Sequence, residues 1–377
     1  MALFYADRVG QTSTTSGTGT FDLDGSIDGF QGFVAAGAGG QTVKYFAKEG
    51  TAWEVGIGVV TDASPDTLTR AVLLDSSTGS AINFAGAQEI YLDAPAEDFH
   101  EHPQICQGRL TATTGTPVTT ADATSSTLYL TPYKGNKMAL YGNGRWKVFT
   151  FSELSLAIGG LTTGKPYDIF AYDNSGSPTL EALVWTNDTT RATALATQDG
   201  VYVKSGDATR RYLGTIYTIT DSTVKVRDSA AERKIWNYYN RVHRHMVVQE
   251  TTNSWSYSTA SYRSLNNSTA NRLQFVRGVS EDLVIAQTTQ SSRTSSASQW
   301  SHGIGLDSTS ADSSSLKGYG WHSGAGVTRT ESSWYIGQPS AGFHYLQALE
   351  YGGTGMTFYG DDGGDFLKSG IKGEVWA

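Results

Sequence analysis

The sequence predicts a mainly β protein with more than one domain, and three observations support this prediction. The chain has 377 residues, enough for about two or three domains of ordinary size. Gly, Ser and Thr are abundant, yet aromatic residues reach 11%, and a disordered chain would lack them. Short apolar runs with alternating polar residues are bounded by turn-forming residues, which is typical of strands. We expect N-terminal and middle antiparallel β-domains, a short α-helix and a C-terminal β-sandwich of the jelly-roll kind.

Residues 1–105 form the first predicted domain. In TAWEVGIGVVT the apolar residues Trp53, Val55, Ile57 and Val59 alternate with polar or small residues, which indicates a half-buried strand. Further short strand-like runs follow, each ended by residues that favour turns. Closely spaced strands without a helical period favour a small β-sandwich or barrel.

Residues 106–228 form the middle domain. In MALYGNGRWKVFTF, Asn143 and Gly144 stand between two strand-like runs. This pair predicts a β-hairpin, because a tight turn of this type requires positive φ at both central residues. The other runs read as strand, turn and strand, so the domain is expected to be antiparallel.

A helix of about four turns is predicted over residues 229–246, SAAERKIWNYYNRVHRHM. Ser229 and Glu232 have the spacing of a capping box, and apolar residues follow at helical spacing. An isolated helix of this length is marginal in water, so its apolar stripe must be buried. A sheet of the same chain or copies of the helix around a symmetry axis could bury the stripe, and both remain open. In the second case the trimer interface consists of Ile235, Tyr238, Tyr239 and Val242.

Residues 247–377 form the last predicted domain, in which strand-like runs are separated by Ser- and Gly-rich loops. Trp300, Tyr319 and Trp321 lie in or beside these loops. Aromatic side chains among small polar residues can form a recognition surface, here for a surface glycan. Burial in the core of the sandwich is the other interpretation, and the sequence does not decide between the two.

The neighbouring residues Trp334 and Tyr335 have a different setting. They precede Ile336 in a short apolar run, and we therefore predict that both fill the core of the sandwich.

Two His-x-His pairs are candidate metal ligands. In an extended segment alternate side chains share a face, so His243 and His245 of three chains could present their imidazoles to one transition metal ion. His100 and His102 form a second, weaker candidate. An ordinary pair of histidines near a helix end is the favoured interpretation, so we expect no cofactor.

Several other classes of function are disfavoured. The net charge is −8 and the pI about 5.4, whereas nucleic-acid binding calls for a basic footprint. The sequence contains no run of about 18 apolar residues, the length that would indicate membrane insertion. Cys106 is the one cysteine, so the chain forms no internal disulfide. Paired carboxylates, a nucleophile elbow and a P-loop are all missing, and we expect no catalytic residue and no enzyme.

Several segments resemble virion structural proteins of tailed bacteriophages and prophages, of the tail-fibre and head-fibre kind. The segments are FSELSLAIGGLTTGKPYDIFAYDNSG, LVWTNDTTRATALATQDGVYVKSGDATRRYLGTIY, IWNYYNRV and GFHYLQALEYGG. In addition, GTGTFDLDGSIDGFQGF and TAWEVGIGVV resemble an N-terminal module of such proteins. The resemblance covers most of the chain and includes no catalytic motif.

The resemblance implies a homotrimeric fibre that is made in the cytoplasm of a bacterial host and built into the virion. Its N-terminal module would dock on other virion proteins, of the tail or of the capsid. Its C-terminal domain would face outward for host attachment, with a cell-surface glycan as a candidate partner. A capsid decoration or head-fibre protein that stabilises the particle is the alternative, and a glycan-cleaving tailspike is a third. A shared fold alone does not assign a site.

Overall fold

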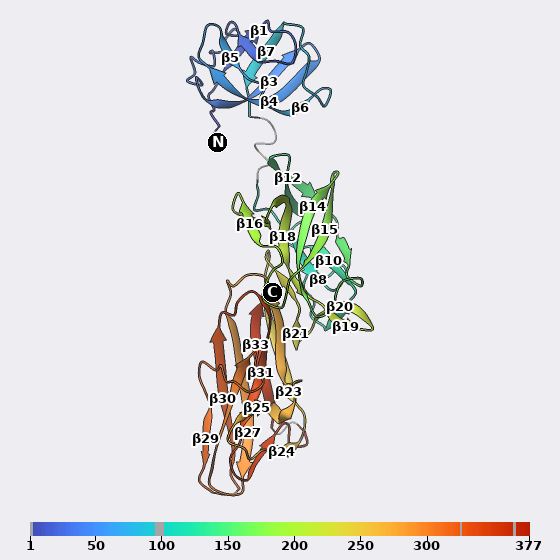
Figure 1. Ribbon diagram of the computed structural model, residues 1–377, viewed down its shortest axis with the longest axis vertical. Coiled ribbons are helices and arrows are strands. Elements are labelled where there is room, and N and C mark those ends of the chain that lie inside the picture. Colours follow the sequence, from blue (N-terminus) through green and yellow to red (C-terminus); the bar gives the residue numbers. More distant parts are fainter. Residues whose placement is uncertain (1–2, 95–101, 325, 365–366) are drawn as a thin grey trace. The chain divides into compact units, whose positions relative to one another are not determined.

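The structure is a computed structural model that describes residues 3–94, 102–324, 326–364 and 367–377. The chain divides into two compact units, residues 1–101 and residues 102–377. Figure 1 shows that strands dominate both units. Within the described residues, helical structure is confined to the 3-10 turn η2, Leu265–Asn267. The predicted mainly β fold is confirmed, but the predicted α-helix is absent.

The first unit contains one antiparallel sheet in the order β1-β7-β3-β4-β5-β2, with β6 also paired to β4. Aromatic side chains, among them Phe21, Phe33, Tyr45 and Phe84, fill the core of this unit. The strands are β1 (Gly10–Ser13), β2 (Phe21–Leu23), β3 (Thr42–Glu49), β4 (Ala52–Thr61), β5 (Asp66–Leu68), β6 (Val72–Ser76) and β7 (Gln88–Leu92).

The strand predicted around residue 55 is β4, but Trp53, Val55, Ile57 and Val59 of its alternating pattern are only half-buried. Val55 is half-buried, whereas Glu54 and Gly56 on either side of it are buried. The Glu54 carboxylate accepts hydrogen bonds from Arg70 and from the Tyr45 hydroxyl (2.9 Å). A Cβ at Gly56 would lie 2.5 Å from that hydroxyl, so the glycine leaves room for the tyrosine ring.

The middle part of the second unit contains three small antiparallel sheets. One of them is the β11–β12 hairpin, which turns at Asn143 and Gly144 with φ angles of 51° and 77°. The predicted hairpin is therefore confirmed. The sheets are β13 (Leu154–Ala157), β10 (Thr127–Pro132) and β8 (Gly108–Thr111); β11 (Lys137–Gly142) and β12 (Arg145–Thr150); and β15 (Ser177–Val184), β14 (Pro166–Asn174), β18 (Asp207–Tyr217), β17 (Val201–Lys204) and β16 (Leu195–Gln198), with β22 (Ile235–Asn237) on β18.

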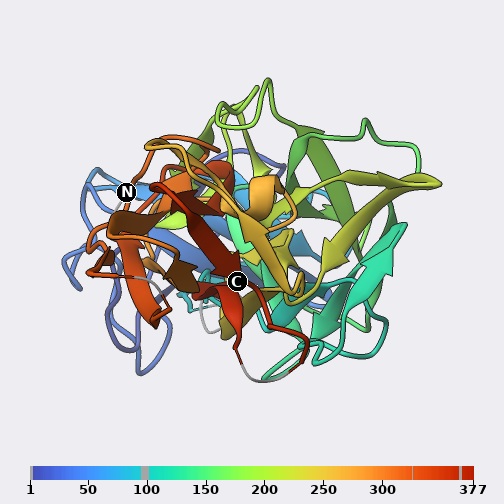
Figure 2. The same cartoon turned by 90° about the horizontal axis from the view of Figure 1, so that it is seen from below.

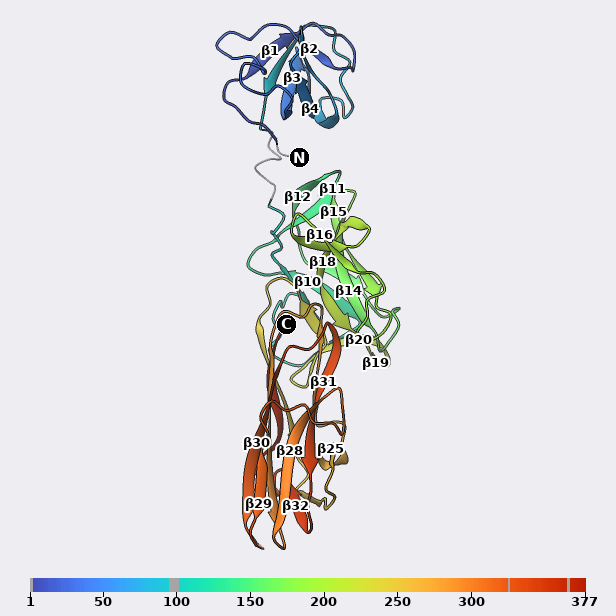
Figure 3. The same cartoon turned by 60° about the vertical axis from the view of Figure 1, so that its left-hand side comes forward.

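The C-terminal part of the second unit is a sandwich of two sheets, whose long strands lie side by side in Figure 3. Leu346 and Ala348 of the larger sheet pack with Met246 and Ile371 of the smaller sheet, which gives the layered core of a jelly-roll-like sandwich. The larger sheet is β19 (Ile219–Asp221), β20 (Thr223–Asp228), β21 (Glu232–Arg233), β26 (Arg272–Arg277), β31 (Gly342–Tyr351), β28 (Ser298–Leu306) and β29 (Tyr319–His322), with β25 (Tyr262–Ser264) on β31 and β9 (Ala123–Ser125) on β20. The smaller sheet is β23 (His243–Glu250), β33 (Ser369–Trp376), β27 (Val284–Thr294), β32 (Met356–Tyr359) and β24 (Ser254–Ser256), with β30 (Thr328–Gly337) on β27.

Residues 229–246 form extended pieces where a helix is predicted, so the helix prediction is wrong. β21 pairs with β26, β22 pairs with β18 of the middle part, and β23 pairs with β33 of the smaller sheet. The Glu232 amide does donate a hydrogen bond to the Ser229 hydroxyl (3.1 Å), as in a capping box. The chain then leaves this turn as a strand.

Burial on both sides of the chain explains why the segment is extended. All residues from 233 to 237 are buried. Ile235 enters the core of the middle part, and Trp236 enters the core of the sandwich. Neighbouring residues of an extended chain point to opposite sides, so together they serve two cores, whereas an amphipathic helix needs one face in solvent.

The residues predicted as a trimer interface make contacts within the chain. Ile235 is 4% exposed and offers no surface to another chain. The rings of Tyr238 and Tyr239 contact each other with centroids 4.8 Å apart, and burial raises the pKa of Tyr239. The amide of Val242 donates to the carbonyl of Ala377 (3.0 Å), near the C-terminus marked in Figure 2. A contact of the last three with another chain stays a prediction.

Candidate interaction faces of the C-terminal sandwich

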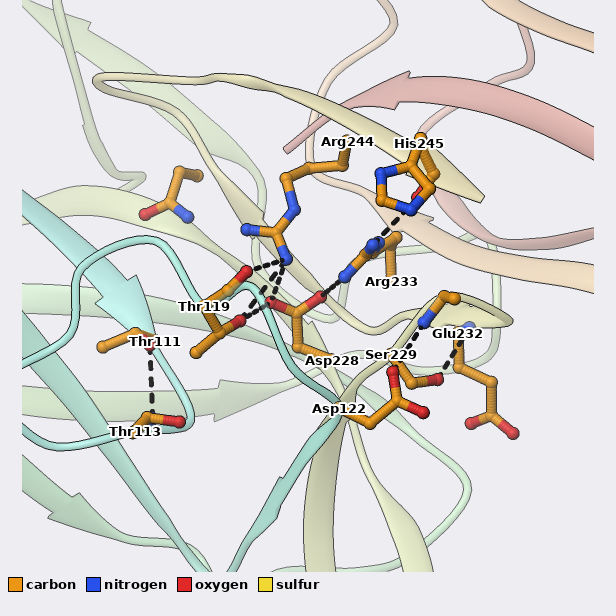
Figure 4. A network of polar contacts seen from close by, with 12 residues as sticks. Thr111, Thr113, Thr119, Asp122, Asp228, Ser229, Glu232, Arg233, Arg244 and His245 are labelled. Atoms are coloured by element: carbon orange, nitrogen blue, oxygen red, sulfur yellow. Dashed lines mark hydrogen bonds and ion pairs between the residues drawn. The ribbon is translucent and has the colours of Figure 1, made fainter. Parts of the chain in front are cut away.

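A buried ionic network holds β23 in the sandwich (Figure 4). The Asp228 carboxylate accepts hydrogen bonds from Arg233 (2.7 Å), Arg244 (3.1 Å) and the Thr119 hydroxyl (2.9 Å). Arg233 also donates to the backbone carbonyl of His245 (2.8 Å). Arg244 therefore points into the protein. Since alternate residues of a strand point to opposite sides, the residues on either side of Arg244 face outward.

The guanidinium groups of Arg109, Arg233 and Arg244 lie around the Asp228 carboxylate. Burial lowers the pKa of Arg244. Burial also lowers the pKa of nearby Arg109, to about 10, with the charge of Arg244 as the second cause. Asp228 is thus the carboxylate that compensates the guanidinium groups gathered beneath β23.

The outer side of the smaller sheet carries an unusual number of exposed apolar side chains. Val247 is 46% exposed, Ile336 48%, Trp334 37% and Trp376 38%; Ile285 is half-buried among them. We call this surface the apolar face. Contiguous exposed apolar surface on a soluble protein marks an interaction site.

The register of the strands places these side chains in rows across β23, β33, β27 and β30. One row contains His245, Glu374, Ile285 and Ile336, and the next contains Val247, Lys372, Gln287 and Trp334. Lys372 and Glu374, which carry opposite charges, therefore lie at the centre of the apolar face as alternate residues of β33. A depression of about 430 Å³ lies over the same strands and is lined by Val247, Ile285, Trp334, Lys372 and Glu374 among others.

His243 and His245 lie on the same side of β23 and are both exposed. The His243 ring packs on Trp376, with centroids 3.7 Å apart, and its Nδ1 lies 3.6 Å from the Glu374 carboxylate. Within the described residues of one chain, no group of three or more His, Cys, Asp or Glu side chains could hold a metal ion. Metal binding between chains stays a prediction. His100 of the second pair lies outside the described residues.

Of the three predicted glycan contacts, the prediction is wrong for Trp300. Its side chain is 0% exposed and packs in the sandwich near Phe358, with ring centroids 6.3 Å apart. Tyr319 and Trp321 are 56% and 48% exposed. The register explains the difference: Trp300 pairs with Gly320, whose side faces the core, whereas Tyr319 and Trp321 occupy the alternate positions of β29.

Trp334 is the functional candidate that the sequence prediction placed in the core. The structure buries its neighbour Tyr335, which is 6% exposed, and turns Trp334 outward. The available signal was strand alternation, because two neighbouring residues of one strand cannot both face the same core.

Acid is expected to destabilise the sandwich through His302, which is 0% exposed beside Trp300. Burial lowers the pKa of His302 from 6.5 to about 4, and its ring nitrogens have no hydrogen-bond partner among the described residues. The unfolded chain therefore holds the proton more tightly. As the pH falls from 6.5 to about 4, the free energy of unfolding decreases, by about 3 kcal/mol at the lower limit.

Urea unfolding at pH 7, 5.5 and 4.5 (chosen as about the span of this titration) checks the prediction. His302→Phe should lose most of this pH dependence, whereas His243→Gln, at an exposed position, should retain it. An equal dependence on pH in the His302→Phe variant and the unchanged protein would contradict the prediction.

The described residues contain no helix with the length and apolar character needed to span a bilayer. No protein-family model and no curated protein matches the chain.

Solved structures match only distantly. A structure of infectious bursal disease virus, strain Gx, matches at 12% identity over 68% of this chain and 70% of that chain, with a TM-score of 0.24. A Cry1Da tryptic core variant of Bacillus thuringiensis matches at 6% identity over 67% of this chain and 48% of that chain, with a TM-score of 0.17. These TM-scores are too low for a shared arrangement of strands, so neither structure carries a conclusion about this chain.

Proposed function

We propose that this chain is a non-enzymatic structural protein of a tailed-phage virion that assembles as a homotrimer through its apolar face. The N-terminal unit docks on another virion protein, and the C-terminal sandwich faces outward for host attachment. The observation that carries the proposal is the apolar face on the outer side of the smaller sheet. The resemblance of several segments to phage virion proteins supplies the setting.

The composition of the apolar face favours contact with protein. Aliphatic side chains such as Val247, Ile285 and Ile336 gain most when another apolar surface excludes water from them. Trp334 belongs to the residue types enriched in protein interfaces. Lys372 and Glu374 carry opposite charges in adjacent rows, so copies of the same face can place a cation of one chain against an anion of the next.

The edges of the sheet suit a cyclic arrangement. The apolar face extends from β23 on one side to β30 on the other; Val247 of β23, Trp376 of β33 and Trp334 and Ile336 of β30 are its exposed apolar residues. In a closed ring, one region of a copy meets a different region of its neighbour. Three copies arranged in this way would cover all their apolar faces.

The separate organisation of the N-terminal unit supports a docking role. This unit has its own sheet and its own aromatic core, distinct from the cores of residues 102–377. It can therefore hold its shape while bound to a different protein. A capsid decoration or head-fibre role uses the same parts and differs in where on the particle the unit docks.

Native mass spectrometry over a range of concentrations tests the assembly. The expected mass is three times that of the 40.4 kDa chain, and a monomer at every concentration would overturn it. Electron microscopy of the particle with a label on this chain separates tail from capsid. Release of oligosaccharides from host polysaccharide by the purified protein would overturn the non-enzymatic role.

A further inference from the structure

We propose that the outer side of the larger sheet binds a neutral saccharide through a row of aromatic side chains. The inference deepens the proposed role in attachment and rests on it for its biological setting. The surface lies on the opposite sheet from the apolar face and has a different chemistry. We call it the tyrosine row and define it by Tyr262, Tyr319, Trp321 and Tyr351.

Strand register brings the row together from distant parts of the sequence. On four neighbouring strands, Tyr319 lies opposite Ser301, Ser301 opposite Tyr351, and Tyr351 opposite Tyr262. The rings of Tyr262 and Tyr351 have centroids 5.3 Å apart. Trp321 stands two residues along β29 from Tyr319 and therefore on the same side of the sheet. The aromatic rings thus line one continuous surface.

The polar groups between the rings are arranged to accept and donate further hydrogen bonds. The Ser301 hydroxyl donates to the carbonyl of Gly318 (2.7 Å), so the Tyr262 hydroxyl is the donor in its contact with Ser301 (3.0 Å). Among the described residues, the hydroxyls of Tyr319 and Tyr351 make no hydrogen bond to protein. Exposed Gln299, opposite Trp321, adds an amide.

Charge beside the row is compensated. The ammonium group of Lys317 lies 5.1 Å from the Tyr262 ring and forms an ion pair with Asp312. The pairing raises the pKa of Lys317 and lowers that of Asp312, so both stay charged and neutralise each other. Lys317, the cation that the described residues place beside the row, is thus already paired, which favours a neutral sugar over an acidic one.

The combination fits a sugar ring better than a protein surface. A pyranose presents C–H groups on its faces and hydroxyls around its edge, so it needs flat apolar rings with hydrogen-bonding groups between them. The tyrosine row offers both. It has none of the exposed aliphatic side chains of the apolar face, which a protein partner would cover.

The test measures retention of the intact protein on an array of immobilised neutral and acidic bacterial polysaccharides. The unchanged protein should bind one or more neutral polysaccharides. Trp321→Ala and Tyr319→Ala should each weaken binding by about tenfold, because each removes one stacking ring. Trp321→Phe should retain most of the binding. Tyr5→Ala, which removes a 49% exposed ring from the N-terminal unit, is the matched control and should bind normally.

The binding assay would overturn the inference by any of these results: no retention on any neutral polysaccharide, retention on acidic ones alone, or equal binding by Trp321→Ala and the unchanged protein. Native mass is measured for every variant. A change of mass in Trp321→Ala would identify the tyrosine row as an interface between copies and also overturn it. A monomeric protein that binds glycan through Trp321 would refute the trimer alone, so the two proposals fail separately.

Discussion

Replacing Asp228 by Ala is expected to lower the free energy of unfolding of residues 102–377 by about 3–5 kcal/mol, the usual cost of breaking a buried ion pair from one side. The Asp228 side chain is 12% exposed, and the side chains of its partners Arg233 and Arg244 are each 6% exposed. Without the carboxylate, two buried guanidinium groups lose their counter-ion and face each other. The Thr119 hydroxyl also loses its acceptor.

Chemical denaturation followed by tryptophan fluorescence measures this effect. The matched control is Asp221→Ala, because Asp221 is 46% exposed and its ion pair with Lys225 lies at the surface; such pairs contribute about 0–1 kcal/mol. Double replacement of Asp228 and Arg244 should recover part of the loss, since it removes one of the stranded charges. Equal stability of the Asp228→Ala variant and the control would refute the role given to the network.

The second large effect is expected at Val247. Val247→Asp should convert the proposed trimer to a monomer while the chain stays folded. Val247 is 46% exposed on β23, at one edge of the apolar face, so an aspartate there is solvated in the monomer. In the trimer it would be buried without a partner, at a cost of several kcal/mol for each copy, roughly the penalty of an unpaired interface charge.

Native mass spectrometry and circular dichroism together decide this prediction. Val72→Asp makes the same change at a 48% exposed valine of the N-terminal unit and should leave the mass unchanged. A Val247→Asp protein that remains a trimer would show that the apolar face is not the interface. Loss of the circular dichroism signal would indicate misfolding, in which case Ile336→Lys on β30 repeats the test from the other edge of the face.

The sequence predicted local structure correctly where the interaction joins residues that are close in the chain. Asn143 and Gly144 form the predicted hairpin because positive φ at both positions is a property of those two residues. The hydrogen bond between Ser229 and Glu232 also forms. This bond does not cap a helix. The residues after the turn are extended, because Ile235 is buried in one core and Trp236 in the other.

Whether an aromatic residue is exposed or buried depends on which side of its strand it lies on, and the sequence alone does not show which side faces the core. Trp300 and Trp321 have similar Ser- and Gly-rich surroundings in sequence, yet one is buried and the other exposed. Trp334 and Tyr335 were both expected in the core, and only Tyr335 is. In each case the partner strand fixes which side of the sheet faces the core, and that partner is distant in the chain.

The sequence by itself determined the class of fold, the antiparallel character, the tight turns and the abundance of aromatic side chains, because these follow from composition and short-range patterns. The tertiary structure alone decided that residues 229–246 are extended and that Val247 and Trp334 share a face. It also decided that Tyr262, Tyr319 and Tyr351 form a row. The physical reason is that a strand has no partner within itself: hydrogen bonds to remote strands set its register, and register decides which side chains meet.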